Sequence, residues 1–372
     1  MKESKPKSVD TILLALITLM VAGGFLIFSS ASLGLMARDG ATFGSVAFSQ
    51  FVFGIICGGI ALLITSNVYY RHWRKYAFYL FAITLIATIA VFIPGIGMTH
   101  AGATRWLDLG ITTVQPSEFL KIGFVIYLAT WLSGVHDRIQ YWKYGLLPFL
   151  GTIGLVGAVM LPQPDTDTFL IIAFAGMAMF LSAGAKWRDI GIIILSGVIM
   201  LAIIAMTRPY IMDRFTTFLD PDADPLGSGY QIQQSLIAVG SGSVTGRGFG
   251  QSIQKFEYLP EPIGDSIFAV YAEEFGFVGS VILILSLVFL TLRGYRIATE
   301  ASDIFGTLLV VGFMTILITQ SFLNIAAMLA LAPLSGLPLP FISHGGTALL
   351  ATLASLGIVL NVSRHRTFKK GA

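Results

Sequence analysis

The chain has 372 residues, of which 55% are apolar and 12% are charged, and its formal net charge is +3. Soluble domains carry roughly 25% charged residues, so this composition excludes an ordinary water-solvated globular protein. The single cysteine, Cys57, excludes an intramolecular disulfide.

Apolar residues come in blocks of about 20, which is typical of membrane-spanning helices and unlike the short alternating strands of outer-membrane barrels. The first block, 11–37, has no charge and is too long for the apolar core of a signal peptide, so we expect an uncleaved span. The sequence predicts an all-α, polytopic membrane protein with about ten spans, at 11–37, 43–66, 77–98, 118–133, 145–162, 168–184, 189–207, 266–292, 304–331 and 342–363.

The distribution of Lys and Arg predicts the orientation. If the N-terminus is cytoplasmic, 16 of the 23 basic residues lie in cytoplasmic segments, as the positive-inside rule requires. We therefore expect both tails, 1–10 and 364–372, to be cytoplasmic. The residues 1–372 are expected to form a single transmembrane domain. The outer segment 208–265 contains Phe, Tyr, Ile and Leu throughout, which favours an ordered extracytoplasmic loop between spans 7 and 8.

Ionisable residues are rare within membrane spans, and those that occur usually mark a functional site. Glu118 and Lys121 are three residues apart and share one face of a helix. They form either an internal salt bridge or a functional polar wall. Asp165 and Asp167, beside Pro162 and Pro164, fit a surface turn as well as a site.

Asp265 ends the run that starts at Glu257 and leads directly into the eighth span. A carboxylate at a helix N-terminus is favoured by the helix dipole, so a capping role is one interpretation of Asp265. A catalytic carboxylate at the outer end of the span is the other interpretation.

Motifs on the predicted outer side resemble those of a known family in order and spacing, over nearly the whole chain. They are Trp106 with Gln115-Pro116-Ser117-Glu118; Asp224-Pro225 to Gly229-Tyr230, with Gln234-Ser235 and Gly240-Ser241-Gly242; Tyr258-Leu259-Pro260-Glu261 to Asp265; and Asn324, through Leu337-Pro338-Leu339-Pro340-Phe341-Ile342-Ser343, to Gly345-Gly346. The chain thus resembles the SEDS family (shape, elongation, division and sporulation), which includes the FtsW and RodA proteins. It departs from the usual family pattern at Asp167, where Gly is common, and at His344, where Tyr is common.

The resemblance implies a peptidoglycan glycosyltransferase that polymerises lipid II at the outer face of the bacterial cytoplasmic membrane. The essential aspartate of the family corresponds to Asp265, which we expect to be the general base. His344 is either a substrate contact or a structural hydrogen-bonding residue. Substrate contacts are expected from Arg105, Trp106, Glu118, Lys121, Asp165, Arg247, Lys255, Glu261, Ser343 and His344.

The implied partners are lipid II, a single-span class B penicillin-binding protein that supplies transpeptidation, and divisome or elongasome proteins. The segment 208–265 carries four basic and seven acidic side chains, so a divalent cation, Mg²⁺ or Mn²⁺, is compatible with it, although no ligand set follows. No organic cofactor and no nucleic acid are expected.

Two other functions fit the sequence. A lipid II flippase or transporter would also use intramembrane charges, although its polar residues belong at the membrane midplane. A non-catalytic divisome scaffold is the second. The stretch Gln254-Lys255-Phe256-Glu257-Tyr258-Leu259 favours the division type over the elongation type. The metal, the direction of chain growth, the partner and the oligomeric state stay open.

Overall fold

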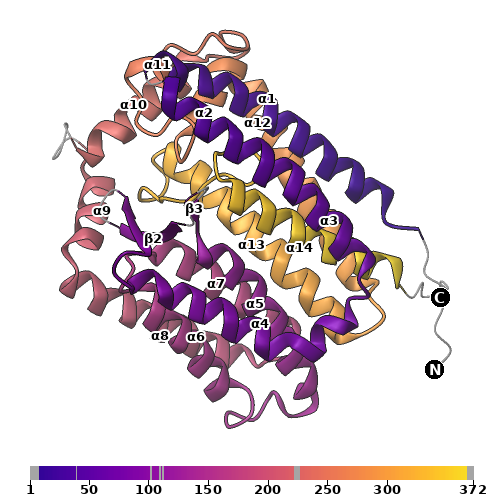
Figure 1. Cartoon of the computed structure of the whole chain (residues 1–372). Helices are drawn as coiled ribbons and strands as arrows, with labels where there is room; N and C mark the ends of the chain where they lie inside the picture. The colour runs from indigo at the N-terminus through magenta and orange to yellow at the C-terminus, as the bar shows by residue number, and fades with distance from the viewer. Residues whose placement is uncertain are drawn as a thin grey trace.

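The computed structural model describes residues 8–38, 40–100, 103–108, 110, 113–221 and 227–366. Its helices are α1 (Thr11–Arg38), α2 (Gly40–Phe48), η1 (Ser49–Cys57), α3 (Gly58–Asn67), α4 (Arg71–Ile89), η2 (Ala90–Phe92), α5 (Pro116–Gly134), η3 (His136–Arg138), α6 (Leu146–Met160), α7 (Thr166–Ser182), α8 (Trp187–Thr207), α9 (Pro209–Leu219), α10 (Ser228–Ser241), α11 (Gln254–Glu257), α12 (Ile267–Thr299), α13 (Ile304–Met328) and α14 (Gly346–Arg364). Figure 1 shows them as one bundle.

The predicted all-α membrane architecture is confirmed. Seven helices of the described chain are long and apolar enough to cross a membrane, and α6 and α7 are shorter apolar helices. The remaining predicted span coincides with α5, whose hydropathy is lowered by Glu118 and Lys121. Each of the ten predicted spans therefore overlaps a helix or, for 43–66, the continuous α2–η1–α3 segment. The predicted span 77–98 was too long, because its helical part ends at Phe92.

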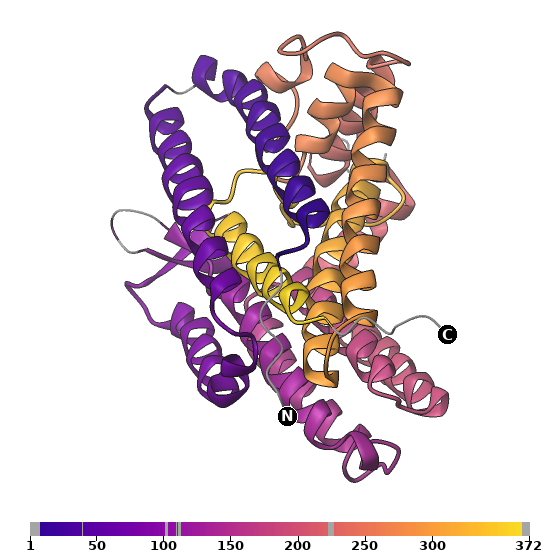
Figure 2. The ribbon, with the colours of Figure 1, turned by 90° about the vertical axis from the view of Figure 1, so that its right-hand side faces the viewer.

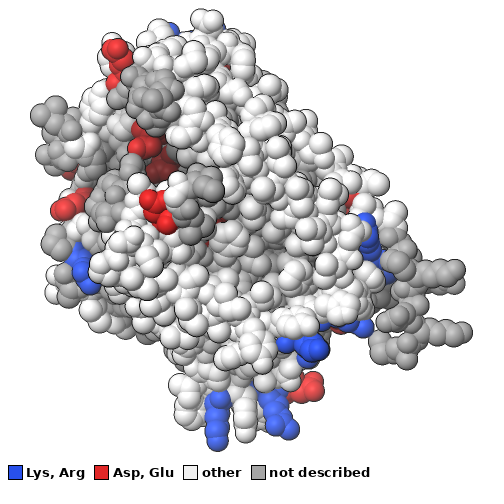
Figure 3. Space-filling view, in the orientation of Figure 1, with Lys and Arg blue, Asp and Glu red and all other residues white. Residues whose placement is uncertain are grey.

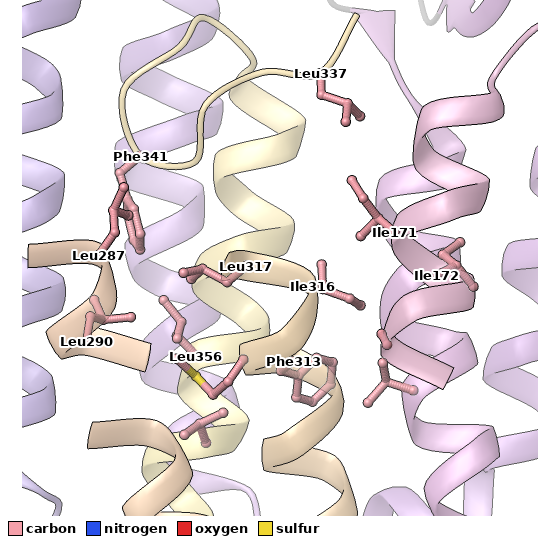
Figure 4. Close-up of a cluster of buried hydrophobic side chains, with 14 of the residues drawn as sticks. Ile171, Ile172, Leu287, Leu290, Phe313, Ile316, Leu317, Leu337, Phe341 and Leu356 are labelled. Atoms are coloured by element: carbon pink, nitrogen blue, oxygen red, sulfur yellow. The ribbon is translucent and has the colours of Figure 1, made fainter. Parts of the chain in front are cut away.

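The core of the bundle surrounds α13, which packs against α5, α7, α12 and α14. Figure 4 shows Phe313, Ile316 and Leu317 of α13 between Ile171 on α7 and Leu290 on α12. Helix α14 runs between α3 on one side and the α12–α13 pair on the other, as Figure 2 shows. These apolar contacts hold the helix ends that carry the polar loops.

The segment between η2 and α5 contains a small sheet that the sequence did not predict. Strands β1 (Gly97–His100), β2 (Ala103–Asp108) and β3 (Thr113–Val114) pair antiparallel in the order β1-β2-β3. The register shifts between Met98 and Thr99, which is a bulge. Strands this short, one of them bulged, leave no readable alternation in the sequence.

The predicted outer loop 208–265 is largely helical where it is described. Helix α9 docks on the start of α7, where Tyr210 Oη lies 2.8 Å from Thr166 Oγ1. Gln231 of α10 donates to Ser266 Oγ at the start of α12, at 3.0 Å. The motif residues Asp224 and Pro225, and the tail residues 1–7 and 367–372, lie outside the described residues.

Helix α12 is interrupted at Gly276, whose φ of 66° and ψ of −163° are not helical. The backbone groups freed by the break bind the preceding loop. The carbonyls of Glu273 and Glu274 accept from the N–H groups of Arg247 and Gly248 at 3.0 and 2.9 Å. A Cβ atom at residue 276 would lie 2.3 Å from Gly246 N, so only glycine fits.

The two ends of the described chain lie at one end of the bundle, where Asp10 pairs with Arg293 and Arg366. This agrees with an even number of crossings. Figure 3 shows most Lys and Arg of the visible face toward that end, and a hollow bordered by Asp and Glu at the opposite end. The surface between them is almost uncharged. The opposite end corresponds to the predicted outer side.

Candidate active site

A cavity of about 640 Å³ opens at the predicted outer end of the bundle. Its walls come from the ends of α1, α2 and η1, from the sheet, from α9, from the 261–265 segment, and from the loop that joins α13 to α14. The residues that line it are Leu35, Val46, Ser49, Met98, Ala103, Arg105, Trp106, Thr113, Gln115, Arg214, Glu261, Pro262, Ile263, Gly264, Asp265, Gly336, Pro338, His344, Gly345, Gly346, Thr347 and Ala348.

Asp265 lies two residues before α12, on a backbone that other segments hold in place. Asn324 Nδ2 of α13 donates to the backbone oxygen of Asp265 at 2.8 Å. Ser343 Oγ donates to the oxygen of Gly264 at 2.7 Å, and His344 N donates to the oxygen of Ile263 at 2.7 Å. Three consecutive carbonyls are thus fixed from outside the segment.

The capping interpretation of Asp265 is not supported. Helix α12 has Ser266 as its N-cap, without a side-chain capping bond. The Asp265 carboxylate lines the cavity. Burial raises its pKa from the ordinary 3.8 to about 7, with further increases from the negative charges of Glu261 and Asp167; Arg105 and Arg214 oppose the rise. A carboxylate with this pKa can accept a proton near neutral pH.

Arg105 is the main buried cation of the cavity, and its side chain is 9% exposed. Strand β2 carries it, and the turn before α7 holds it: Nε donates to the oxygen of Gln163 at 3.4 Å and Nη2 donates to the oxygen of Pro164. Asp165 Oδ1 lies 3.9 Å from Nη1. Asp165 therefore stands behind Arg105 and is not part of the cavity wall.

His344 lines the cavity as a neutral side chain, because burial lowers its pKa to about 4. Its ring stacks on Phe28, with the ring centroids 6.2 Å apart. Nε2 is buried and has no hydrogen-bond partner among the residues that the structure describes. Ser343, in contrast, binds Gly264 and Leu339 and holds the loop together.

Glu118 and Lys121 form a buried ion pair with a nitrogen–oxygen distance of 2.8 Å. Lys121 Nζ also donates to Gln320 Oε1 at 2.8 Å, and Gln320 Nε2 donates to the oxygen of Pro338. Neither charged residue lines the large cavity; both lie on a separate small one. The structure thus shows the internal salt bridge, connected through Gln320 to the cavity wall at Pro338.

Two further expected substrate contacts lie away from the cavity, at the break in α12. Lys255 is fully buried, and its Nζ lies 2.7 Å from Glu274 Oε1 and 3.1 Å from Ser30 Oγ. Arg247 Nε lies 3.3 Å from Glu273 Oε1. Both side chains are neutralised by carboxylates of α12, and this gives them a role in holding the loop to the helix.

Of the expected site residues, the structure brings Arg105, Trp106, Glu261 and His344 together with Asp265 around the cavity. Arg214 and Gly336 also line the cavity, although the sequence did not predict them as site residues. Arg214 lies outside the motifs, and its partner Asp167 is 47 residues away in the chain. Gly336 directly precedes the Leu337-Pro338 motif, which was the only available signal.

Gln50 was also missed, and it supports the cavity from behind. It lies in the π-helix η1, and its side-chain amide is bound to the loop: Nε2 donates to the oxygen of Ser343 at 3.3 Å, and Oε1 accepts from the N–H of Gly345 at 3.0 Å. Stretches of π-helix often occur at functional sites.

The expected divalent cation finds no ligand set. Among the residues covered by the structure, no three His, Cys, Asp or Glu side chains are grouped so that they could hold a metal ion. Mg²⁺ prefers octahedral oxygen ligands, of which Glu261 and Asp265 provide only part. The described residues therefore supply no complete ligand set of their own, and the expected divalent cation stays a prediction.

Comparison with known proteins places the chain among a set of relatives of the same length. The profile of the family FTSW_RODA_SPOVE, described as "Cell cycle protein", matches residues 10–368. Stage V sporulation protein E of Bacillus subtilis (strain 168) is 37% identical over 367 residues, which cover 97% of this chain and 99% of the relative. A probable peptidoglycan glycosyltransferase FtsW of Geobacter sp. (strain M18) is 36% identical, covering 95% and 96%.

Two solved structures have the same fold. The first carries the description "Structural coordination of polymerization and crosslinking by a peptidoglycan synthase complex". It matches with a TM-score of 0.78 and 29% identity, over 96% of this chain and 98% of that one. The rod shape determining protein RodA of Thermus thermophilus matches with a TM-score of 0.69 and 26% identity, over 97% and 98%.

Proposed function

The chain belongs to the FtsW/RodA/SpoVE family of cell cycle proteins, and we propose that it is a peptidoglycan glycosyltransferase whose active site is the cavity around Asp265. Its relatives include proteins named as probable peptidoglycan glycosyltransferases. The observation that carries the assignment to this site is a carboxylate with a pKa of about 7 that shares one cavity with a buried arginine.

In the proposed reaction, the 4-hydroxyl of the GlcNAc of an incoming lipid II attacks the anomeric carbon of the growing chain. Asp265 accepts the proton of that hydroxyl as the new glycosidic bond forms. The bond between the anomeric carbon and the pyrophosphate breaks, and its electron pair leaves with undecaprenyl pyrophosphate. A carboxylate with an ordinary pKa would be a weaker base.

The developing charge on the leaving pyrophosphate requires cations, and arginine suits bidentate phosphate contacts. Arg105 and Arg214 line the cavity. Lys121, Lys255 and Arg247 do not line this cavity, which favours the two cavity arginines for this role.

We further propose that the cavity faces the outside of the bacterial cytoplasmic membrane, with both chain ends in the cytoplasm. The basic end of the bundle supports this orientation. A single-span class B penicillin-binding protein and other proteins of the division or elongation machinery are proposed as partners. A reporter that is active only outside the membrane, fused at Ala372, should be inactive; an active fusion would contradict the orientation.

The direct test is polymerisation of labelled lipid II by the purified protein, with and without a class B penicillin-binding protein. The wild type should form glycan strands, and Asp265→Asn should lower the rate by roughly 10²–10⁴-fold, as expected for loss of a general base. Normal membrane insertion of the variant is the control. Transport of lipid II across vesicle membranes without polymerisation would instead favour a flippase. Recruitment of the partner without polymerisation or transport would favour a scaffold.

A further inference from the structure

Asp167 connects three separate segments at the edge of the cavity. It lies in the first turn of α7, where the helix dipole favours a carboxylate. Its Oδ2 accepts from Arg214 Nη1 of α9 at 2.7 Å and from the backbone N–H of Gly336 at 3.2 Å. A single carboxylate oxygen thus ties α9 and the α13–α14 loop to α7.

Both groups that Asp167 holds are walls of the cavity that contains Asp265. Gly336 is especially close to the reactive side chains. A Cβ atom at this glycine would lie 3.7 Å from Asp265 Oδ2 and 3.4 Å from Arg105 Nη1. Asp167 itself is not among the cavity-lining residues, so it acts on the cavity through Arg214 and Gly336.

We propose that Asp167 is a positioning residue for the transfer reaction, which holds Arg214 as a second phosphate-binding side chain beside Arg105 and fixes Gly336 against Asp265. This inference rests on the proposed function of the cavity. The ligand class is the phosphate or pyrophosphate group of a lipid-linked sugar. The side chain of Arg214 is 29% exposed, and the nearly buried carboxylate of Asp167 keeps it at the cavity wall.

The charges around Asp265 make the role of Asp167 distinguishable from a merely structural one. Glu261 and Asp167 raise the pKa of Asp265, whereas Arg105 and Arg214 lower it. His344 also lines the cavity but is neutral near pH 7. Replacing Asp167 removes a negative charge, and replacing Arg214 removes a positive one. The two substitutions should therefore move the pKa of Asp265 in opposite directions.

The experiment compares Asp167→Asn, Arg214→Gln and the double variant in full-length protein with labelled lipid II. Loss of positioning should lower kcat/KM by about 10–100-fold in each single variant. The double variant should lose little more than either single variant, because both remove the same interaction. The rising limb of the pH–rate profile should move to lower pH in Asp167→Asn and to higher pH in Arg214→Gln.

Asp303 provides a matched control at the other end of the bundle. It accepts from Arg71 Nε at 2.7 Å and from the N–H of Gly306 at 2.8 Å, and therefore also joins an arginine to a glycine N–H. Asp303→Asn should lose similar stability without changing the pH–rate profile. An unchanged kcat/KM and pH profile in Asp167→Asn, or additive losses in the double variant, would overturn the proposal.

A binding measurement separates this proposal from the proposed function. Lipid II binding is measured with Asp265→Asn protein, which needs no turnover, with and without Asp167→Asn. The added substitution should weaken binding by roughly tenfold, since one arginine contact to phosphate loses its orientation. If the wild type does not polymerise lipid II but this weakening occurs, the catalytic assignment fails and the role of Asp167 in binding stands. Equal binding contradicts the role of Asp167.

Discussion

Asn324 Nδ2 lies 2.8 Å from the backbone oxygen of Asp265, and the same amide group donates a second hydrogen bond of 2.8 Å to the oxygen of Leu337. One fully buried side chain of α13 therefore joins the segment that carries the proposed base to the loop that forms the facing wall.

Replacing Asn324 by Ala should impair catalysis beyond its effect on stability. The buried carbonyl of Leu337 and the partly buried carbonyl of Asp265 lose their donor, which should cost about 1–3 kcal/mol in unfolding free energy. The displaced Asp265 should lower kcat by roughly tenfold or more. Asn361 is the matched control, because its buried Nδ2 donates to the oxygen of Ser66 at 2.8 Å at the opposite end. Asn361→Ala should lose similar stability at unchanged kcat. Equal kcat losses in both variants would argue against a specific role for Asn324.

The polymerisation rate should depend on pH through Asp265. Its pKa of about 7 means that the basic form is the minor species below pH 7 and the major one above. We expect kcat/KM to rise with pH and to level off above an apparent pKa near 7. A rate that is flat from pH 5 to 8 would show that the base has an ordinary carboxyl pKa.

The same carboxylate should make folding less favourable at high pH. Its pKa in the folded protein is raised above the unfolded value of 3.8, so its contribution to stability is fully present below pH 4 and is lost as the pH rises through 7. Asp265→Asn, which cannot ionise, should therefore unfold at a higher temperature than the wild type at pH 8. The two melting temperatures should approach each other at pH 5. A gap of the same size at both pH values would contradict this origin.

A methyl group at residue 336 should obstruct the substrate without disturbing the fold. In Gly336→Ala, the new Cβ meets Arg105 and Asp265 at ordinary contact distances of 3.4 and 3.7 Å. It fills space between two reactive side chains, so we expect kcat/KM to fall by roughly tenfold or more. Gly59→Ala is the control, since nothing lies within 4 Å of its Cβ position. Steady-state kinetics at equal melting temperature would check the prediction; equal kcat/KM would refute it.

The buried Glu118–Lys121 pair should matter mainly for stability. Lys121→Met leaves the Glu118 carboxylate uncompensated, which should cost about 3–5 kcal/mol. Glu118→Gln combined with Lys121→Met should restore much of this loss. Arg296, 67% exposed in its pair with Glu300, is the reference, and Arg296→Gln should cost less than about 1 kcal/mol. Thermal unfolding of all four proteins gives the comparison, and a double variant as unstable as Lys121→Met would exclude the buried-charge explanation.

The membrane architecture could be predicted because the lipid requires long apolar helices, and 11–37 or 304–331 shows this in composition alone. The roles of the basic residues could not be predicted in the same way. Lys255 is neutralised by Glu274, 19 residues away, and donates a hydrogen bond to the hydroxyl of Ser30, 225 residues away. Only the folded chain shows that this lysine supports the loop at the break in α12.

The place of Asp265 at the outer cavity could be predicted because its motif is contiguous, leads into an apolar helix and resembles that of a known family. Arg214 could not, because its place at the cavity depends on Asp167, across the fold on α7. The strands β1–β3 were missed for a local reason, since the bulge at Met98 and Thr99 disrupts an already short pattern. Cavity residues that belong to one contiguous motif were therefore predictable from the sequence. Cavity residues that folding brings together from distant segments were not.

The break at Gly276 divides α12 into two helical parts. The part that follows Asp265, Ile267–Phe275, is hydrogen-bonded through Glu273 and Glu274 to the loop at Arg247 and Gly248. The longer remainder is fixed in the bundle by its apolar contacts. The 243–248 loop also binds this remainder, because the N–H groups of Phe277 and Val278 donate to the oxygens of Ser243 and Val244 at 2.9 and 3.1 Å. The loop therefore joins the two parts of the helix across the break, nine residues beyond the start of α12, which follows the proposed base.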